Sequence, residues 1–232
     1  MKLDIDIYRF MRALSEVRPV FHSEADFQHA FAWALYQQWL GAQVRLELPI
    51  TVESSVLHLD VWVVIEAQPL AIELKYKTAL LDAQIREERF HLRNHSVQDI
   101  GRYDFIQDIE RLELITTANP QCNGWAIMLT NEAQYWRPRP GGHTVDSAFR
   151  LAEGCTLQGE LAWGSGASPG TMRSRERPLS LHGTYQVNWK PYSHEQSVSN
   201  GEFRYLALPV VPVPGVTGKL PAPGRRTLEA HG

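Results

Sequence analysis

Three strand-length segments between residues 44 and 76 constrain the fold of this chain more than any other feature. Over 44–50, apolar side chains alternate with polar ones, which predicts a half-buried strand. Two further apolar runs cover 56–65 and 70–76, and the connection over 66–69 is short enough for a hairpin. We therefore expect three neighbouring antiparallel strands.

Helices are predicted before these strands. A short helix is expected over 3–18 and ends at Pro19. A stronger helix is expected over 23–40, because Ser23 is a favourable N-cap and Gly41 is a typical stop.

A second set of elements follows the strands. Residues 79–93 are predicted to be a charged helix or a loop. Ser96 is expected to cap a helix that runs to about residue 114, and 125–129 is an apolar run typical of a buried strand. A helix between two strands favours a crossover, so we expect an α/β fold with a mixed central sheet flanked by helices.

The sequence of the second half of the chain gives weaker signals of secondary structure. We expect a core over 1–136, an extension over 137–208 that packs on the core, and a disordered Pro- and Gly-rich tail over 209–232. Residues 164–177 are rich in Gly, Ser and Arg and indicate a loop. Further strands are expected over 185–189 and 203–208.

Composition excludes several classes of protein. Apolar residues make up 44% of the 232 positions and the net charge is −3, so a dedicated basic nucleic-acid coat is excluded and any such contact must be local. The two cysteines, Cys122 and Cys155, are too few for a disulfide framework. We find no leader and no membrane-spanning run, and we expect a soluble cytoplasmic protein.

The predicted hairpin brings two acids and a lysine together. Glu73 and Lys75 are two residues apart on one strand and point to the same side, and Asp60 lies on the preceding strand. Two carboxylates suit a hard divalent cation, and a nearby ammonium can orient an attacking water. The alternative is a solvated polar face. One face of the Asp60 strand is expected to hold Leu57, Leu59, Val61 and Val63.

This pattern, with its element order, resembles the PD-(D/E)XK nuclease superfamily, whose core is that of restriction endonucleases. The order helix, three strands, helix and strand covers 23–130, about half of the chain. Leu59 stands where many members have a proline. The resemblance implies a restriction-endonuclease-like core and a Mg²⁺-dependent endo- or exodeoxyribonuclease, in which Mn²⁺ can substitute. Asp60 and Glu73 would bind the metal, Lys75 would position the water, and DNA would be the partner. The family also allows for a homodimer.

The resemblance further implies an acid on the first core helix. Glu24 shares the inward stripe of Phe27 and Phe31, whereas Asp26 lies on the opposite side and is interpreted as a cap. We therefore predict that Glu24 assists at the metal. The alternative is an acid favoured by the helix dipole.

The helix over 96–114 offers second-tier candidates. Gln98 and Arg102 extend its apolar stripe backwards, and family members use such residues to contact the phosphate or hold the lysine. The alternative is that both reach solvent. An ion-pair ladder within the helix is the expected role of three residues on the other face, Asp104, Asp108 and Arg111.

Two basic segments are candidate contacts to the DNA backbone, namely 86–95 and the loop with Arg173, Arg175 and Arg177. His91 and His95 have the spacing of metal ligands, but no third ligand type accompanies them.

Other functions stay open. The chain can be a catalytically inactive module of the same fold that binds nucleic acid or a protein. A glycosidase using Glu24 and Glu73 is less favoured because the tryptophans are expected in the core. These tryptophans are Trp33, Trp39, Trp62 and Trp125.

Overall fold

A six-stranded mixed sheet forms the centre of the structure, a computed structural model that describes residues 5–52, 55–95, 97–138 and 144–213. The strand order is β1-β2-β3-β6-β10-β9, and among these neighbours only β3 and β6 run parallel. This confirms the expected α/β fold with a mixed sheet. The strands are β1 Gln43–Val52, β2 Ser55–Ile65, β3 Gln68–Lys77, β6 Asn123–Thr130, β9 Lys190–His194 and β10 Glu202–Val210.

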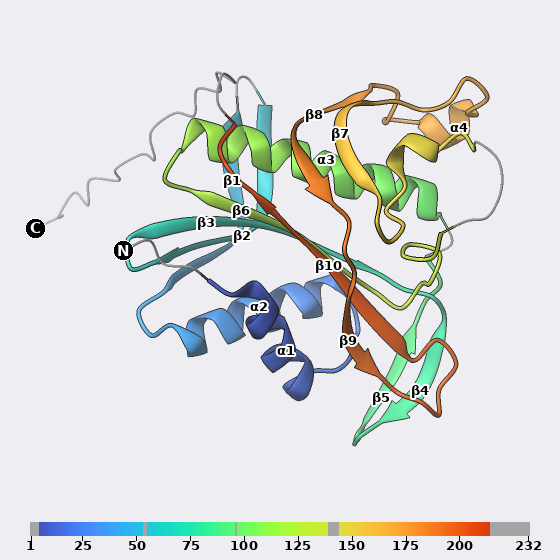
Figure 1. The fold of residues 1–232 in the computed structure, drawn as a ribbon. Helices are drawn as coiled ribbons and strands as arrows, with labels where there is room; N and C mark the ends of the chain where they lie inside the picture. Colours follow the sequence, from blue (N-terminus) through green and yellow to red (C-terminus); the bar gives the residue numbers. More distant parts are fainter. Residues whose placement is uncertain (1–4, 53–54, 96, 139–143, 214–232) are drawn as a thin grey trace, which may run out of the picture.

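Helices cover both faces of this sheet (Figure 1). Helices α1 (Ile7–Val17) and α2 (Glu24–Gln38) pack on one face, and α3 (Gln98–Ala118) packs on the other. The small antiparallel sheet of β7 (Thr156–Leu161) and β8 (Leu179–Gln186) lies outside α3. No helix in the described residues is long and apolar enough to cross a bilayer. Two short elements complete the set, η1 Ser147–Phe149 and α4 Pro169–Met172.

The β2–β3 hairpin sets the register of the later site. Its connection is a two-residue turn, Glu66–Ala67, in which both residues have positive φ, 50° and 65°. Such turns match the twist of the flanking strands. The ladder starts at Ile65–Gln68, so each position of β2 has a fixed opposite position on β3.

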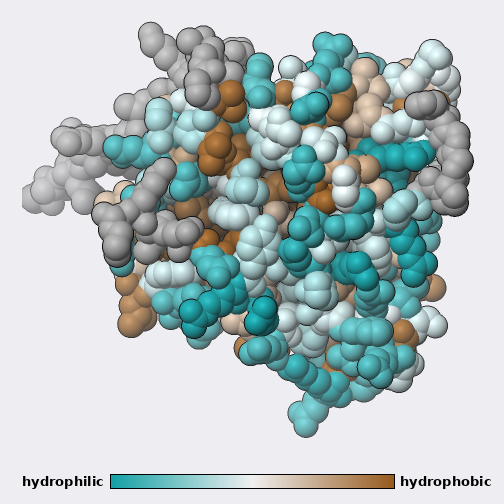
Figure 2. Space-filling view, in the orientation of Figure 1, coloured by the Kyte–Doolittle hydropathy of each residue, from teal (hydrophilic) through white to brown (hydrophobic). Residues whose placement is uncertain are grey.

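The segment over 79–93 is a second hairpin, so the prediction of a charged helix or loop is partly wrong. Its strands are β4 (Leu81–Ile85) and β5 (Glu88–Leu92). Every second side chain of β4 is buried, and the others are exposed. The hairpin lies at the lower right of Figure 1, and Figure 2 shows that its visible face is mostly hydrophilic.

The C-terminal part of the chain belongs to the central sheet. Strand β10 pairs with β6, and β9 pairs with β10. The sheet therefore does not end with residue 136, and the extension over 137–208 does more than pack on a core. Strand β10 also reaches Val210, so the predicted tail over 209–232 begins too early. Residues 214–232, most of the expected Pro138–Gly142 turn and the Ser96 cap lie outside the described residues.

Strand β2 changes faces near its middle. Leu59 packs in the apolar cluster on the α3 side, whereas Val61 and Val63 pack with α1 and α2. The prediction that these residues share one face is therefore wrong. The prediction of a core position for Trp33 is also wrong, because its side chain is 61% exposed on α2 and stacks on Tyr36.

Helix α3 is enclosed on two sides, which requires a glycine near its start. Tyr135, which follows β6, packs with its hydroxyl against Gly101 of α3. A Cβ on Gly101 would lie 2.2 Å from the Tyr135 Oη atom. Glycine at position 101 therefore lets Tyr135 approach the helix closely, although glycine has a lower helix propensity than alanine.

We expect Gly101→Ala to destabilise the protein by about 1–3 kcal/mol, because the new methyl group overpacks the contact. Urea unfolding measures this change. The double variant Gly101→Ala/Tyr135→Phe should recover most of the loss, since it removes the colliding oxygen. Equal destabilisation of the single and double variants would contradict this account of Gly101.

Candidate active site

The ladder between β2 and β3 stops one position before the predicted acids. Its last pair is Val61–Ile72, and the next positions are Asp60 and Glu73. Beyond this point β2 no longer pairs with β3, and the Asp60 carboxylate accepts the Leu74 N–H at 2.7 Å. Asp60 is thus held against β3 by a charge-assisted hydrogen bond at the opening of the two strands.

Glu24 also accepts a backbone N–H group of β3, two residues after the one that Asp60 accepts. Its Oε2 atom accepts the Tyr76 N–H at 2.8 Å. Glu24 is the first residue of α2, so the helix start directs this carboxylate to the sheet. Asp26, by contrast, pairs with Arg18 at 2.7 Å and accepts the His22 N–H. The choice of Glu24 over Asp26 by helical phase therefore agrees with the structure.

Gln28 supports Asp60 from behind. Its Nε2 atom donates to the Asp60 carbonyl and to Glu47 Oε1, both at 2.9 Å. Glu47 has a positive φ of 49° and lies on β1 between the pairs that flank Asp60. A left-handed residue in a strand marks a local irregularity, and β2 changes faces at this level. Gln28 was not predicted, although it lies one helical turn after Glu24 on the same side of α2.

Helix α3 supplies two further residues. Lys75 Nζ lies 2.8 Å from Asp108 Oδ2, and Arg111 Nη2 lies 3.1 Å from Glu73 Oε1. Asp108 and Arg111 also pair with each other at 3.2 Å, as the sequence predicts for this helix face. Arg111 Nη2 in addition donates to the His58 carbonyl of β2 at 2.6 Å. The predicted ladder is therefore incomplete, because these two residues mainly hold β2 and β3.

The cluster has strongly perturbed proton affinities. Burial raises the pKa of Glu73 well above its usual value, and the neighbouring Asp108 and Asp60 raise it further. Burial also raises the pKa of Asp60 and of Asp108, against the opposing effects of the Leu74 N–H and of Lys75. Burial alone would lower the pKa of Lys75, but nearby acids, Asp108 first, outweigh it, so its pKa is raised and the ammonium stays charged.

The charges of the cluster do not balance. Four carboxylates face two cationic side chains, which leaves a net charge of −2 when all are ionised. Glu73 is 2% exposed, and its Oε1 atom has the ion pair with Arg111 Nη2 at 3.1 Å but no hydrogen bond of good geometry from the described residues. A divalent cation would relieve both features, and carboxylate oxygens suit Mg²⁺. Asp60 and Glu73 thus fit such an ion, although the described residues contain no ready-made cage of three His, Cys, Asp or Glu side chains.

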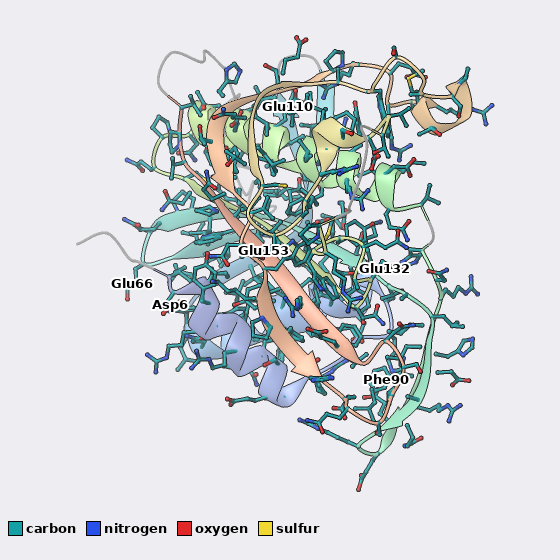
Figure 3. All side chains as sticks on the ribbon, turned by 45° about the vertical axis from the view of Figure 1, so that its right-hand side comes forward. Asp6, Glu66, Phe90, Glu110, Glu132 and Glu153 are labelled. Carbon is teal, nitrogen blue, oxygen red and sulfur yellow. The ribbon has the colours of Figure 1, made fainter. Side chains whose placement is uncertain are left out.

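Gln98 and Arg102 are not part of this cluster. Gln98 donates to Glu132 at 3.4 Å, and Arg102 binds Asp146 and the Gln134 carbonyl. Their stripe faces the segments that follow β6, which the sequence did not place (Figure 3 labels Glu132 there). The second-tier assignment to the catalytic centre is therefore corrected: Asp108 and Arg111 occupy that position.

The basic segments are largely engaged within the molecule. Arg175 pairs with Asp104 of α3 at 2.6 Å, and Arg177 pairs with Glu110, which Figure 3 labels near β8. In the 86–95 segment, Arg86 donates to the Val17 and Glu16 carbonyls and Arg89 pairs with Asp82, which His91 also approaches. The two arginines that keep no side-chain partner within the described parts of these segments are Arg93 and Arg173.

Comparison with known proteins adds no assignment. No protein-family model, no curated protein and no solved structure matches this chain. The functional argument therefore rests on the geometry of the cluster.

We expect Glu73→Gln to stabilise the metal-free protein at pH 7–8 by on the order of 1 kcal/mol. The pKa of Glu73 is raised, so the folded state binds more protons than the unfolded state above the usual pKa, and stability falls as pH rises through that range. Glutamine removes this penalty. Urea unfolding in EDTA at pH 5 and pH 8 measures it, and the gain should be larger at pH 8.

The exposed Glu160 of β7 provides a matched control. Glu160→Gln makes the same chemical change without burial and should leave stability within about 0.5 kcal/mol. A loss of stability in Glu73→Gln at pH 8 would show that the ion pair with Arg111 outweighs burial.

Proposed function

We propose that this protein is a metal-dependent nuclease that hydrolyses phosphodiester bonds, with DNA as substrate and a PD-(D/E)XK-like catalytic centre. The observation that carries the proposal is the convergence of Asp60, Glu73 and Lys75 where β2 and β3 separate. There the carboxylate of Asp60 accepts the Leu74 N–H, where backbone pairing between β2 and β3 has ended. Burial raises the pKa values of Asp60 and Glu73. Acids on a solvated face of a strand would not show this effect.

Each residue of the cluster has a distinct task in this proposal. Asp60 and Glu73 would hold Mg²⁺ or Mn²⁺, and Glu24 would assist from the other side of the opening. When bound, the ion would lower the pKa of a water and neutralise charge on the scissile phosphate. Lys75 would orient the attacking water and stabilise charge in the transition state.

Asp108 and Arg111 act as positioning residues in the same scheme. Asp108 fixes the Lys75 ammonium at 2.8 Å and keeps it protonated, so that Lys75 donates hydrogen bonds and does not act as a base. Arg111 holds the Glu73 carboxylate and ties α3 to the His58 carbonyl. Helix α3 therefore holds both Lys75, through Asp108, and Glu73, through Arg111. Catalysis requires such fixed positions of the reacting groups.

The second candidate is a catalytically inactive module of the same architecture that binds nucleic acid or a protein partner. The ion pairs of Lys75 with Asp108 and of Glu73 with Arg111 favour it, because they satisfy part of the charge without a cation. The surplus of two carboxyl groups over cationic side chains in the cluster favours the nuclease, because a divalent cation would balance it. Metal binding separates these two candidates.

We expect Lys75→Ala to lower Mg²⁺-dependent cleavage by about 10²-fold or more, the effect of removing one charge-stabilising donor. Cleavage of single-stranded, duplex and branched DNA, with Mg²⁺ or Mn²⁺, measures this. Lys190→Ala on β9 is a control, since among the described residues the Lys190 ammonium has Asn188 as its side-chain partner. Cleavage by Lys75→Ala at the wild-type rate would exclude the proposed role of Lys75.

We expect calorimetric titration to show one Mn²⁺ site per chain in the wild type and none in Asp60→Asn/Glu73→Gln. The double variant removes two charges, while the amide oxygen of the introduced asparagine can still accept the Leu74 N–H. A correctly folded wild type that takes up no metal would favour the inactive module.

A further inference from the structure

Side chains accept a regular series of N–H groups along one edge of β3, the edge that faces β2. The N–H groups of Leu74 and Tyr76 donate to the two carboxylates of the cluster on this edge. Thr78 is the next alternate residue, so its N–H points to the same edge, and it donates to His95 Nδ1 at 3.1 Å. His95 is therefore the third side chain in a series that begins with two acids of the proposed centre.

Backbone contacts fix the position of His95 at the end of β3. The His95 N–H donates to the Thr78 carbonyl at 2.7 Å, so the two residues exchange hydrogen bonds in both directions. The Thr78 hydroxyl in addition donates to the Arg93 carbonyl at 2.6 Å. The imidazole thus has a defined place against β3, although residues 93–95 belong to no helix or strand.

The same contact defines the protonation state of the ring. Because Nδ1 accepts the Thr78 N–H, the proton of the neutral imidazole is on Nε2. Partial burial lowers the pKa of His95 and the charge of Lys77 lowers it further, although Glu24 opposes both. His95 is exposed, so Nε2–H is a neutral donor that a ligand in solvent can reach.

Lys77 continues the row of side chains on β3 that begins with Glu73 and Lys75. The three are alternate residues of one strand, so their side chains leave it on the same face. Asp108 holds the Lys75 ammonium, whereas the charge of Lys77 acts on His95. A cation and a neutral donor therefore lie close together, just beyond Lys75 along the strand.

The step from Lys75 to Lys77 matches the repeat of a nucleic-acid strand. Two residues of a β-strand span about 7 Å, which is comparable to the distance between successive phosphates in DNA. In the proposed nuclease Lys75 acts at the scissile phosphate, so Lys77 and His95 lie about one phosphate further along. Ammonium groups and neutral N–H donors are both common ligands of phosphate oxygens.

We propose that Lys77 and His95 bind the phosphate next to the scissile one, so that the DNA strand follows the β2-side edge of β3. This inference rests on the proposed function, since Lys75 is taken to mark the scissile phosphate. His95 donates Nε2–H to a phosphate oxygen, and Lys77 supplies positive charge. Both residues hold the strand, and neither forms or breaks a bond.

Binding of a fluorescent single-stranded 12-mer, measured by anisotropy in EDTA at pH 7.5, tests the contact independently of cleavage. We expect His95→Asn and Lys77→Gln each to weaken binding about tenfold, the effect of one hydrogen bond to a charged group. The introduced asparagine can still accept the Thr78 N–H, but its shorter side chain does not reach the phosphate. His91→Asn on β5 and Lys190→Gln on β9 make the same changes elsewhere and should have less than a twofold effect.

The salt dependence of binding distinguishes the charged contact from the neutral one. Lys77→Gln should reduce the slope of log K against log salt concentration by about 0.7, because one fewer phosphate of the single strand is neutralised. His95→Asn should leave the slope unchanged, since a neutral imidazole releases no counterion. A reduced slope in His95→Asn would overturn the assignment of His95 as a neutral donor.

A substrate with a single phosphate tests the position of the contact. Bis(p-nitrophenyl) phosphate, cleaved with Mn²⁺, has a scissile phosphodiester but no neighbouring phosphate. We expect Lys75→Ala to impair cleavage of this ester and of the 12-mer, whereas His95→Asn and Lys77→Gln should impair cleavage of the 12-mer alone. Equal losses on both substrates in the last two variants would overturn the assignment to the neighbouring phosphate.

The failure of this inference is distinguishable from the failure of the proposed function. Binding of the 12-mer by His95→Asn and Lys77→Gln as tightly as by their controls overturns the contact, even if the wild type cleaves DNA. A wild type that does not bind the 12-mer overturns it as well. A wild type that cleaves neither substrate rejects the nuclease, and the anisotropy measurements then still decide whether the end of β3 holds a phosphate.

Discussion

The hydrogen bond from the Leu74 N–H to the Asp60 carboxylate is the interaction on which the functional cluster depends. A β-strand that loses its neighbour must satisfy its backbone donors in another way. Here side chains from two different elements, β2 and α2, take over that task. Because carboxylates accept these backbone N–H groups in place of a neighbouring strand, the acidic side chains of Asp60 and Glu24 lie against β3.

This arrangement concentrates unfavourable charge in a buried place. Glu73 and Asp108 are almost completely enclosed, and both have a raised pKa because of burial. Lys75 and Arg111 offset the repulsion only in part. Apolar side chains at these positions would avoid the desolvation cost of the buried charges, so the cluster is not what stability alone would favour.

Local patterns in the sequence predict the centre of the molecule well. Alternation identifies the strand over 44–50, apolar runs identify those over 56–65 and 70–76, and helical phase selects Glu24. Non-local contacts are what the patterns miss. The hairpin of β4 and β5 has alternating burial, but its turn residues Arg86 and Glu87 are not typical hairpin residues.

The errors on α3 have a related cause. We expected one apolar face, but α3 is covered by the central sheet and also by β7 and β8, so polar residues lie between two buried surfaces. Asp108 and Arg111 therefore reach the cluster, and Arg102 reaches a cavity that depends on residues 44 positions later in the chain. Contacts of that kind leave no periodic signal.

The position of β10 between β6 and β9 has a consequence for how the protein is made. During synthesis the meander, α3 and β6 emerge more than seventy residues before β10, and until then β6 presents an unpaired hydrophobic edge. Such an edge invites association with other nascent chains. This edge of β6 is covered only when the C-terminal part of the chain supplies β10, so the N-terminal part depends on residues made much later.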